Sequence, residues 1–193
     1  KPKTNAYLQL IEFLTQCKDD SGIIYTLRRK DTEELAERLN ADGFSAKPYH
    51  AGLDRSVRNR HQDEFLKDET KIVVATIAFG MGIDKSNVRY VVHMDLPKNV
   101  EGYYQETGRA GRDGLASTAR MFYSYSDFFT MQKLVRVADN QEQSDVMEEK
   151  LRQMANYGSL KTCRRRFLLE YFGEKATSLC GNCDYCLHHY EEI

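Results

Sequence analysis

The first 124 residues alternate between short strand-like runs and segments of helical periodicity, and this alternation restricts the fold to few classes. The strand-like runs lie at 21–26, 46–50, 71–76, 88–94 and 119–123. The runs at 71–76 and 88–94 do not alternate between polar and apolar residues, which is typical of central strands buried on both faces. Strands that alternate with helices predict an α/β fold whose parallel sheet has helices on both faces.

Four helices are predicted among these runs, at 5–18, 31–39, 54–66 and 99–107. Asp31 is the predicted N-cap of the second helix, with Glu34 as its reciprocal partner in a capping box. Gly43 is expected to end that helix, and Asp54 is the predicted N-cap of the third. Ligands gather at the carboxyl ends of the strands in an open parallel sheet, so the glycine-rich segments are expected near that edge.

Beyond residue 124 no further strand is predicted, and helices are expected at 126–137, 145–155 and 162–171. A polar stretch without apolar periodicity, at 138–142, marks a boundary between two domains. We therefore expect an α/β domain at 1–140 and a smaller helical domain at 141–193.

Composition narrows the class of partner. The formal net charge is −1, so any nucleic-acid surface must be a local patch. The sequence has no run of about 18 apolar residues, and no membrane partner is expected. Residues 1–5 lack the apolar stretch of a secretory signal and suggest a cut inside a longer chain.

Four of the five cysteines lie in the last 31 residues. Cys180, Cys183 and Cys186 form two overlapping C-x-x-C spacings, and Cys163 lies at the start of a predicted helix. Four thiolates at about 2.3 Å from a metal form a closed, structural zinc site. The alternative is free cysteines or disulfides, but disulfide scaffolds are usually short secreted chains, so we favour a reduced compartment. Cys17 stands alone and is expected to have no chemical role.

The segment 75–85 is rich in glycine and follows a predicted strand. Gly80 and Gly82 would let this loop approach a ligand closely. Thr76 offers a hydroxyl and a main-chain N–H that suit a phosphate, and Asp84 offers a carboxylate that suits a sugar hydroxyl. The alternative is a tight turn with a capping aspartate, since short glycine motifs are weak signals.

The segment 103–114 carries two arginines beside glycines. Arg109 and Arg112 are three residues apart, so they share a face on a helix or turn. Guanidinium groups bind phosphate oxygens bidentately and stay charged. The alternative is a pair of surface arginines that form weak ion pairs with Glu106 and Asp113.

Together these segments resemble the C-terminal RecA-like lobe of a superfamily 2 helicase, specifically of the RecQ family. The resemblance rests on GIIY at 22–25 with Arg29 and Glu33, YHAGL at 49–53, VVATIAFGMGIDK at 73–85 and YYQETGRAGRDG at 103–114. CRR at 163–165, YFGE at 171–174 and the closing CxxCxxC resemble the zinc-binding subdomain of the same family.

The resemblance implies a role for individual residues. Gln105, Arg109 and Arg112 would face ATP, with Arg112 as the arginine finger. The nucleotide-binding set would also include Asp84, which contacts the ribose, together with Gly82 and Gly108. The residues expected to contact DNA are Arg29, His50 and Thr76. The basic cluster at the start of the last helix, which includes Arg164 and Arg165, is either a further DNA contact or a solvated helix face.

The sequence contains no G-x-x-x-x-G-K-[ST] segment to hold the phosphates of ATP and its Mg²⁺. In RecQ-like helicases that segment belongs to a preceding N-terminal lobe. The resemblance therefore implies a partner lobe in the same chain and 3′–5′ unwinding of duplex DNA along one strand. It also implies roles in recombination, replication and repair, in the bacterial cytoplasm at the nucleoid or in a eukaryotic nucleus. This fragment alone is expected to be inactive. The rival hypotheses are a non-catalytic DNA-binding or interaction module and a superfamily 2 translocase that acts on RNA.

Overall fold

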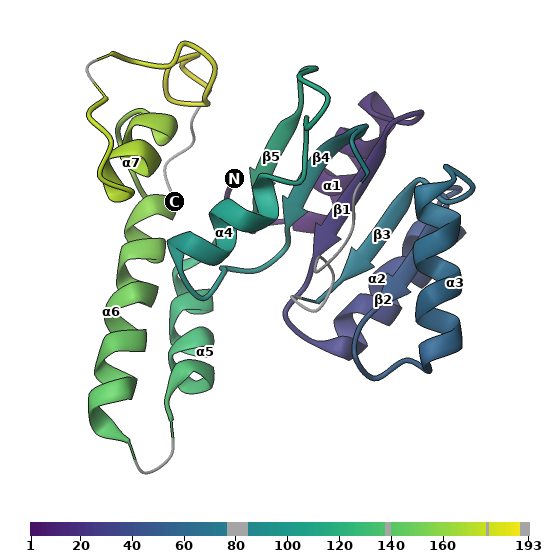
Figure 1. The fold of residues 1–193 in the computed structure, drawn as a ribbon, viewed down its shortest axis with the longest axis horizontal. Helices are drawn as coiled ribbons and strands as arrows, with labels where there is room; N and C mark the ends of the chain where they lie inside the picture. The colour runs from purple at the N-terminus through teal and green to yellow at the C-terminus, as the bar shows by residue number, and fades with distance from the viewer. Residues whose placement is uncertain (77–84, 138–139, 177, 190–193) are drawn as a thin grey trace. The chain divides into compact units, whose positions relative to one another are not determined.

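The computed structural model describes residues 1–76, 85–137, 140–176 and 178–189 (Figure 1). It divides into two compact units. The sheet unit contains Thr4–Asp95 and Glu106–Phe122, and the helical unit contains Lys1–Lys3, Leu96–Gln105 and Tyr123–Ile193. The predicted boundary near residues 138–142 stays a prediction.

The sheet unit is built on five parallel strands in the order β2-β3-β1-β4-β5. The strands are β1 (Ser21–Tyr25), β2 (Ala46–Tyr49), β3 (Ile72–Ala75), β4 (Val88–His93) and β5 (Thr118–Met121). The central strand β1 is buried along its whole length, and Ile23 pairs with Val73 on one side and Val91 on the other. The predicted parallel α/β sheet is confirmed.

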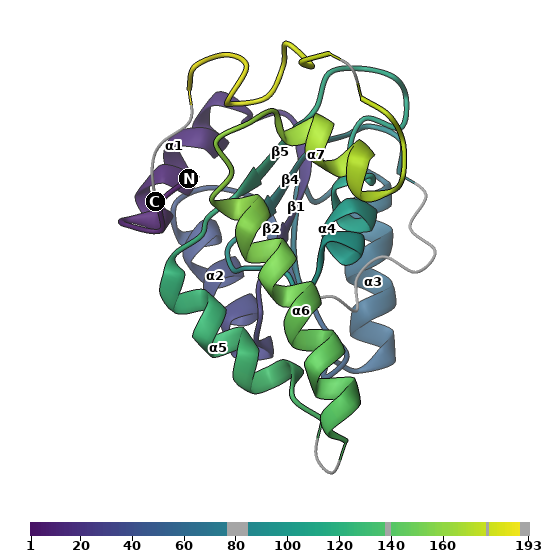
Figure 2. The ribbon, with the colours of Figure 1, turned by 90° about the vertical axis from the view of Figure 1, so that its left-hand side faces the viewer.

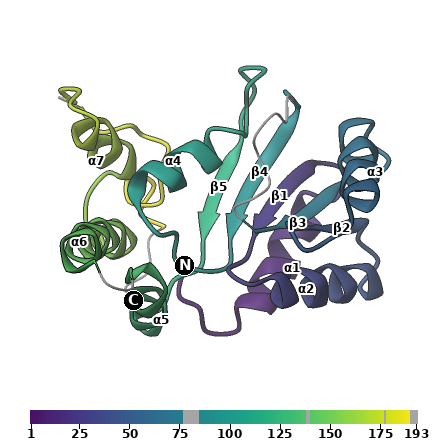
Figure 3. The same ribbon diagram turned by 60° about the horizontal axis from the view of Figure 1, so that its bottom comes forward.

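Helices cover both faces of this sheet (Figure 3). On one face, α1 (Ala6–Gln16) and α2 (Arg29–Ala41) pack on a core that includes Ile24, Val74 and Val92. The neighbouring residues Ile23, Val73 and Val91 point to the other face, where Phe65 of α3 (Arg55–Leu66) contacts them. Burial of each such side chain contributes about 1.5–3 kcal/mol, so the two apolar layers hold the strands in register.

The start of α2 differs from its prediction. The N-cap is Arg28, with extended backbone angles and no side-chain cap, and Asp31 lies inside the first turn. The hydroxyl of Thr32 is hydrogen-bonded to the Arg28 carbonyl at 2.9 Å and to the Thr26 hydroxyl at 2.7 Å, so the helix begins two residues early. The predicted capping box with Asp31 is therefore wrong.

Two other predicted helix ends agree with the structure. Gly43 follows the end of α2 with φ +86°, a backbone conformation that favours glycine. Asp54 is the N-cap of α3, although its side chain makes no capping hydrogen bond.

The helical unit contains α5 (Tyr125–Val135), α6 (Gln141–Gly158), α7 (Arg164–Tyr171) and the beginning of α4 (Val100–Thr107). Helices α5 and α6 lie side by side (Figure 2), and Glu148 accepts hydrogen bonds from Gln132 at 3.0 Å and Arg136 at 2.8 Å. Helix α6 begins four residues before its predicted start because Asn140 caps it by accepting from the Gln143 N–H at 2.9 Å.

Aromatic rings join the helices of this unit. Tyr103 on α4 lies 5.1 Å from Tyr157 on α6, and Tyr157 lies 5.5 Å from Phe167 on α7. In the described parts of the chain, no helix has the length and apolar character needed to cross a membrane.

Candidate functional site

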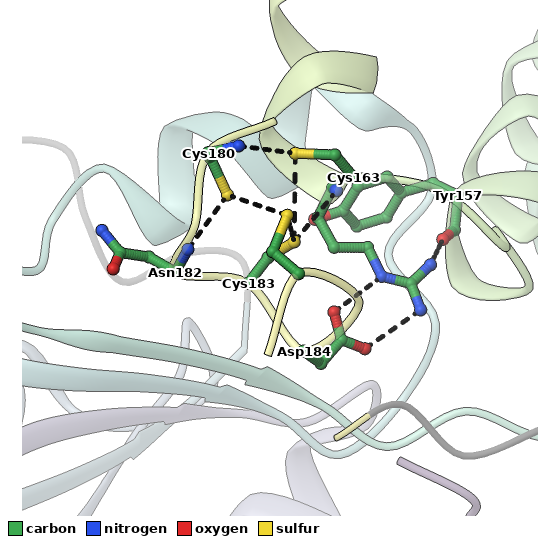
Figure 4. Close-up of polar contacts among 8 residues, drawn as sticks. Tyr157, Cys163, Cys180, Asn182, Cys183 and Asp184 are labelled. Atoms are coloured by element: carbon green, nitrogen blue, oxygen red, sulfur yellow. Dashed lines mark hydrogen bonds and ion pairs between the residues drawn. The ribbon is translucent and has the colours of Figure 1, made fainter. Parts of the chain in front are cut away.

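Four cysteine sulfurs converge at one point of the helical unit. The Sγ atoms of Cys163, Cys180, Cys183 and Cys186 all lie within 4.8 Å of one another. Cys163 precedes α7, and the other three lie on the C-terminal knuckle, with three of the four labelled in Figure 4. The Sγ–Sγ distances are 3.4 Å, 3.8 Å and 3.9 Å for the pairs 183–186, 180–186 and 163–183. A tetrahedron of sulfurs around zinc has edges of about 3.8 Å, so the set fits this metal.

Backbone N–H groups point at these sulfurs and favour their charged forms. The N–H of Cys180 donates to Cys163 Sγ at 3.4 Å, and the N–H of Arg164 donates to Cys183 Sγ at 3.4 Å. Burial raises the pKa of the Cys163 thiol, but hydrogen bonds from backbone and neighbouring thiols outweigh burial and lower this pKa to about 6. Burial and bonds to neighbouring thiols raise the pKa of Cys186 to about 11. A divalent metal replaces the shared protons of such a cluster.

Arg164 links the segment 180–186, called the cysteine knuckle below, to α6 through hydrogen bonds. Its guanidinium donates to the Asp184 carboxylate at 2.9 Å and 3.0 Å and to the Tyr157 carbonyl at 3.0 Å. Asp184 and Tyr157 are labelled in Figure 4, which draws these contacts as dashed lines. Burial raises the pKa of Asp184, but the Arg164 charge outweighs it and lowers that pKa.

This geometry does not fit the predicted contact between Arg164 and DNA, because its guanidinium is occupied inside the protein. Arg165, the next residue, is exposed and stays a predicted DNA contact.

The loop after β2 gathers the residues that resemble DNA contacts. His50 is only 3% exposed, and its Nε2 lies 3.0 Å from the Glu33 carboxylate on α2. Its Nδ1 accepts from the Gly52 N–H at 3.2 Å, which assigns the proton to Nε2. A Cβ on Gly52 would lie 3.0 Å from the Arg29 guanidinium, so glycine lets this exposed side chain lie over the loop. His50 therefore holds the loop in place, and Arg29 is the exposed cation of this set.

Thr76 follows β3 at the carboxyl edge of the sheet. Its main-chain N–H donates to the Tyr49 carbonyl at 3.2 Å, which leaves the hydroxyl as its group for a ligand. The predicted contacts at Gly80, Gly82 and Asp84 lie outside the described residues. Lys85, just after them, is buried and pairs with the Asp68 carboxylate at 2.9 Å.

The segment 103–114, called the arginine segment below, runs back from the carboxyl edge of the sheet toward its amino edge. The Gly111 N–H donates to the Val88 carbonyl at 2.9 Å, at the amino end of β4. The expectation that all glycine-rich segments lie near the carboxyl edge is wrong for this one, because α4 reverses the direction of the chain. Gly111 has φ +70°, and a Cβ there would lie 2.7 Å from the Ser117 hydroxyl.

The three predicted ATP-facing side chains differ in exposure. Gln105 on α4 is exposed, Arg109 is half-buried, and Arg112 is exposed. Arg112 Nε lies 3.4 Å from the carbonyl of Gly108, which is itself exposed. The Arg112 guanidinium is thus exposed to solvent, whereas Arg109 lies partly within the fold.

The two acidic residues of this segment have partners that the sequence did not predict. Asp113 pairs with Arg89 on β4, and Glu106 pairs with His93 at the end of β4 at 2.7 Å. His93 is only 2% exposed. Its partner lies 13 residues away, and no sequence pattern indicated the pair.

Residues 3–114 match the family model described as the helicase conserved C-terminal domain, and residues 125–187 match the one described as RecQ zinc-binding. A crystal structure of a DEAD box protein from Methanococcus jannaschii is similar, with a TM-score of 0.59. It is 27% identical and covers 69% of this chain and 36% of its own. The fold and the arginine segment thus define the C-terminal domain of a helicase.

Relatives with higher sequence identity show which helicase family the chain belongs to. The ATP-dependent DNA helicase RecQ of Haemophilus influenzae is 48% identical over 93% of this chain and 29% of its own length. A putative ATP-dependent RNA helicase, R290, of Acanthamoeba polyphaga mimivirus is 41% identical over 95% of this chain and 34% of its own. The chain belongs to the RecQ helicase family, as a C-terminal helicase region followed by the RecQ zinc-binding domain. It spans about a third of these relatives. The predicted family, fold class and structural zinc site are confirmed.

Proposed function

We propose that this chain is the C-terminal motor lobe of an ATP-dependent 3′–5′ DNA helicase that unwinds duplex DNA in recombination, replication and repair. The observation that carries the proposal is the arginine segment, in which Gly111 is tied to β4 while Arg112 is exposed. A lobe with only a structural role would not need an anchored turn that displays a guanidinium.

The residues of this lobe complete a site that the N-terminal lobe of the same protein begins. That lobe would hold ATP, which would supply the phosphoryl group, and Mg²⁺, which would neutralise the negative charge that develops during transfer. Arg112 is the arginine finger, and Arg109 and Gln105 face the nucleotide beside it. An arginine finger stabilises negative charge in the transition state and is worth roughly 10³–10⁵ in rate in GTPases.

Single-stranded DNA would run over the carboxyl edge of the sheet, where Arg29 and the Thr76 hydroxyl lie. Arg165 would add a phosphate contact on the zinc-binding domain, which duplex DNA approaches. Such contacts are electrostatic, so salt weakens them. The location follows from the substrate: the nucleoid in the cytoplasm of a bacterium, or the nucleus of a eukaryote.

The test is Arg112→Ala in the full-length enzyme, with Arg152→Ala as the control, because Arg152 is an exposed residue of α6. We expect DNA-stimulated ATP turnover to fall at least about 100-fold in Arg112→Ala, with the KM for ATP and the affinity for DNA little changed. The control should match the wild type. Full turnover by Arg112→Ala would refute the proposal.

A second candidate is a translocase that acts on RNA, which the mimivirus relative favours by its name. Comparison of single-stranded DNA and RNA of the same sequence as activators of the full-length ATPase separates the two. We expect DNA to activate more strongly, and stronger activation by RNA would favour the second candidate.

A further inference from the structure

Three buried polar side chains and one half-buried arginine form a cluster in the sheet unit, to which the arginine segment contributes two members. Its members are Tyr25 at the end of β1, His93 at the end of β4, Glu106 in the last turn of α4, and Arg109 just beyond α4. Tyr25, His93 and Glu106 are 4%, 2% and 8% exposed. The function proposed above uses only Arg109 of the four.

The cluster is tightly connected. His93 Nε2 lies 2.7 Å from the Glu106 carboxylate, and the His93 ring stacks on the Tyr25 ring at 5.1 Å with an interplanar angle of 20°. Stacking and a short hydrogen bond leave the imidazole little rotational freedom. One end of α4 is thereby fixed to two neighbouring strands.

Arg109 is joined to the same cluster through Tyr25. The Arg109 guanidinium donates to the Tyr25 hydroxyl, and the Glu106 charge acts on that hydroxyl as well. Burial raises the pKa of Tyr25, so its hydroxyl stays protonated and accepts from Arg109 as a neutral oxygen. A neutral acceptor fixes the direction of a guanidinium and leaves its charge in place. A bound carboxylate would cancel that charge.

Buried charges are retained only where partners satisfy them, because desolvation of an unpaired ion costs several kcal/mol. Here the Glu106 carboxylate faces an imidazole, and the neighbouring Arg109 is hydrogen-bonded to a neutral phenol. We propose that Tyr25, His93 and Glu106 are positioning residues that preorganise Arg109 toward the transferred phosphoryl group. This inference rests on the proposed function of the arginine segment.

The reason for such a device is geometric. Stabilisation of a transition state needs the charge in place before the reaction, and an error of about 1 Å in position can cost roughly 100-fold in rate. A long arginine side chain on a turn has several rotatable bonds, and a partner on a rigid central strand removes that freedom. Tyr25 is such a partner because β1 is buried along its whole length.

The experiment measures ATP turnover by the full-length enzyme with saturating single-stranded DNA. Tyr25→Phe removes only the hydroxyl that accepts from Arg109, and Glu106→Gln removes the charge but keeps an acceptor for His93. Tyr90→Phe is the matched control, because Tyr90 is also a buried tyrosine, on the opposite face of the sheet against α1 and α2. Melting temperatures of all variants are measured alongside.

We expect Tyr25→Phe and Glu106→Gln to lower kcat roughly 10- to 100-fold, with an unchanged KM for ATP and melting within a few degrees of the wild type. Both should also weaken binding of ADP–aluminium fluoride, a transition-state analogue, but not of ADP. Tyr90→Phe should match the wild type. In an Arg109→Ala background, Tyr25→Phe should cause no further loss, because its effect passes through Arg109.

Two results overturn the inference and are distinguishable. If Arg109→Ala lowers turnover but Tyr25→Phe and Glu106→Gln do not, or if the losses multiply in the double variant, the positioning role is overturned while the proposed function stands. If Arg109→Ala itself keeps full turnover, the inference fails because there is no catalytic effect of Arg109 to preorganise, and the proposed function fails with it only if Arg112→Ala also keeps full turnover.

Discussion

Substitution of Arg164 tests whether the zinc-binding domain is held by this side chain or uses it to contact DNA. The guanidinium makes three hydrogen bonds inside the protein, and its side chain is 15% exposed. Arg164→Ala would leave the Asp184 carboxylate in the knuckle without its cation. Loss of one partner of a buried pair costs about 3–5 kcal/mol.

The Asp184 side chain is 41% exposed, so water replaces part of the lost interaction. We therefore expect Arg164→Ala to cost about 2–3 kcal/mol. Asp184 lies between the ligands Cys183 and Cys186, so this cost falls on the folding of the knuckle, which is coupled to metal binding. The apparent affinity for zinc should fall roughly 30- to 150-fold.

The assay is competition for zinc between the protein and a chelator of known affinity, with thermal unfolding measured by circular dichroism. Arg166→Ala on the same helix is the control, because Arg166 forms an exposed pair with Glu170. It should match the wild type, whereas Asp184→Asn should behave like Arg164→Ala. If Arg164→Ala binds zinc as tightly as Arg166→Ala but loses affinity for DNA, Arg164 is a DNA contact and does not hold the knuckle.

Two further predictions concern pH and catalysis. The pKa of Asp68 is lowered to about 2, chiefly by its hydrogen bond with the buried Lys85, so the pair stabilises the fold above the ordinary pKa of an aspartate and loses this effect as the pH falls through about 2. Asp68→Asn should cost about 1 kcal/mol near neutral pH, since the side chain is 39% exposed, and almost nothing at pH 2. A difference in unfolding free energy between Asp68→Asn and wild type that does not change with pH would contradict this role of the ion pair. The 193-residue chain by itself should neither hydrolyse ATP nor unwind DNA, because it has no phosphate-binding G-x-x-x-x-G-K-[ST] loop. Phosphate release stimulated by DNA from this purified chain would show that the missing loop is not required.

The sequence predicted features that depend on local patterns. Continuous apolar runs identified the buried strands, and the spacing of three cysteines identified the knuckle with Cys163 as its fourth ligand. The start of α2 was predicted wrongly because aspartate is a residue type preferred at N-caps, which favoured Asp31. The hydrogen bonds of the Thr32 hydroxyl set the true start. A residue preference of about 1 kcal/mol is easily overridden by a buried hydrogen bond of similar size.

The polar contacts inside the sites could not be predicted, because their partners are distant in sequence. Arg164 and Asp184 are 20 residues apart, His50 and Glu33 are 17 apart, and only the folded chain brings each pair together. Basic residues in a motif look alike in sequence, since each lies beside a glycine or another basic residue.

The structure separates these basic residues into buried or half-buried anchors and exposed, displayed side chains. Arg164 and His50 are held by carboxylates and Arg109 by a tyrosine, whereas their companions Arg165, Arg29 and Arg112 are exposed. An anchor that is removed leaves an unsatisfied partner inside the protein, so its loss affects stability or the position of its neighbour. A displayed cation is exposed to solvent, so its loss is expected to affect the ligand more than the stability of the fold. Stability and ligand binding, measured together for each pair, therefore distinguish the two roles.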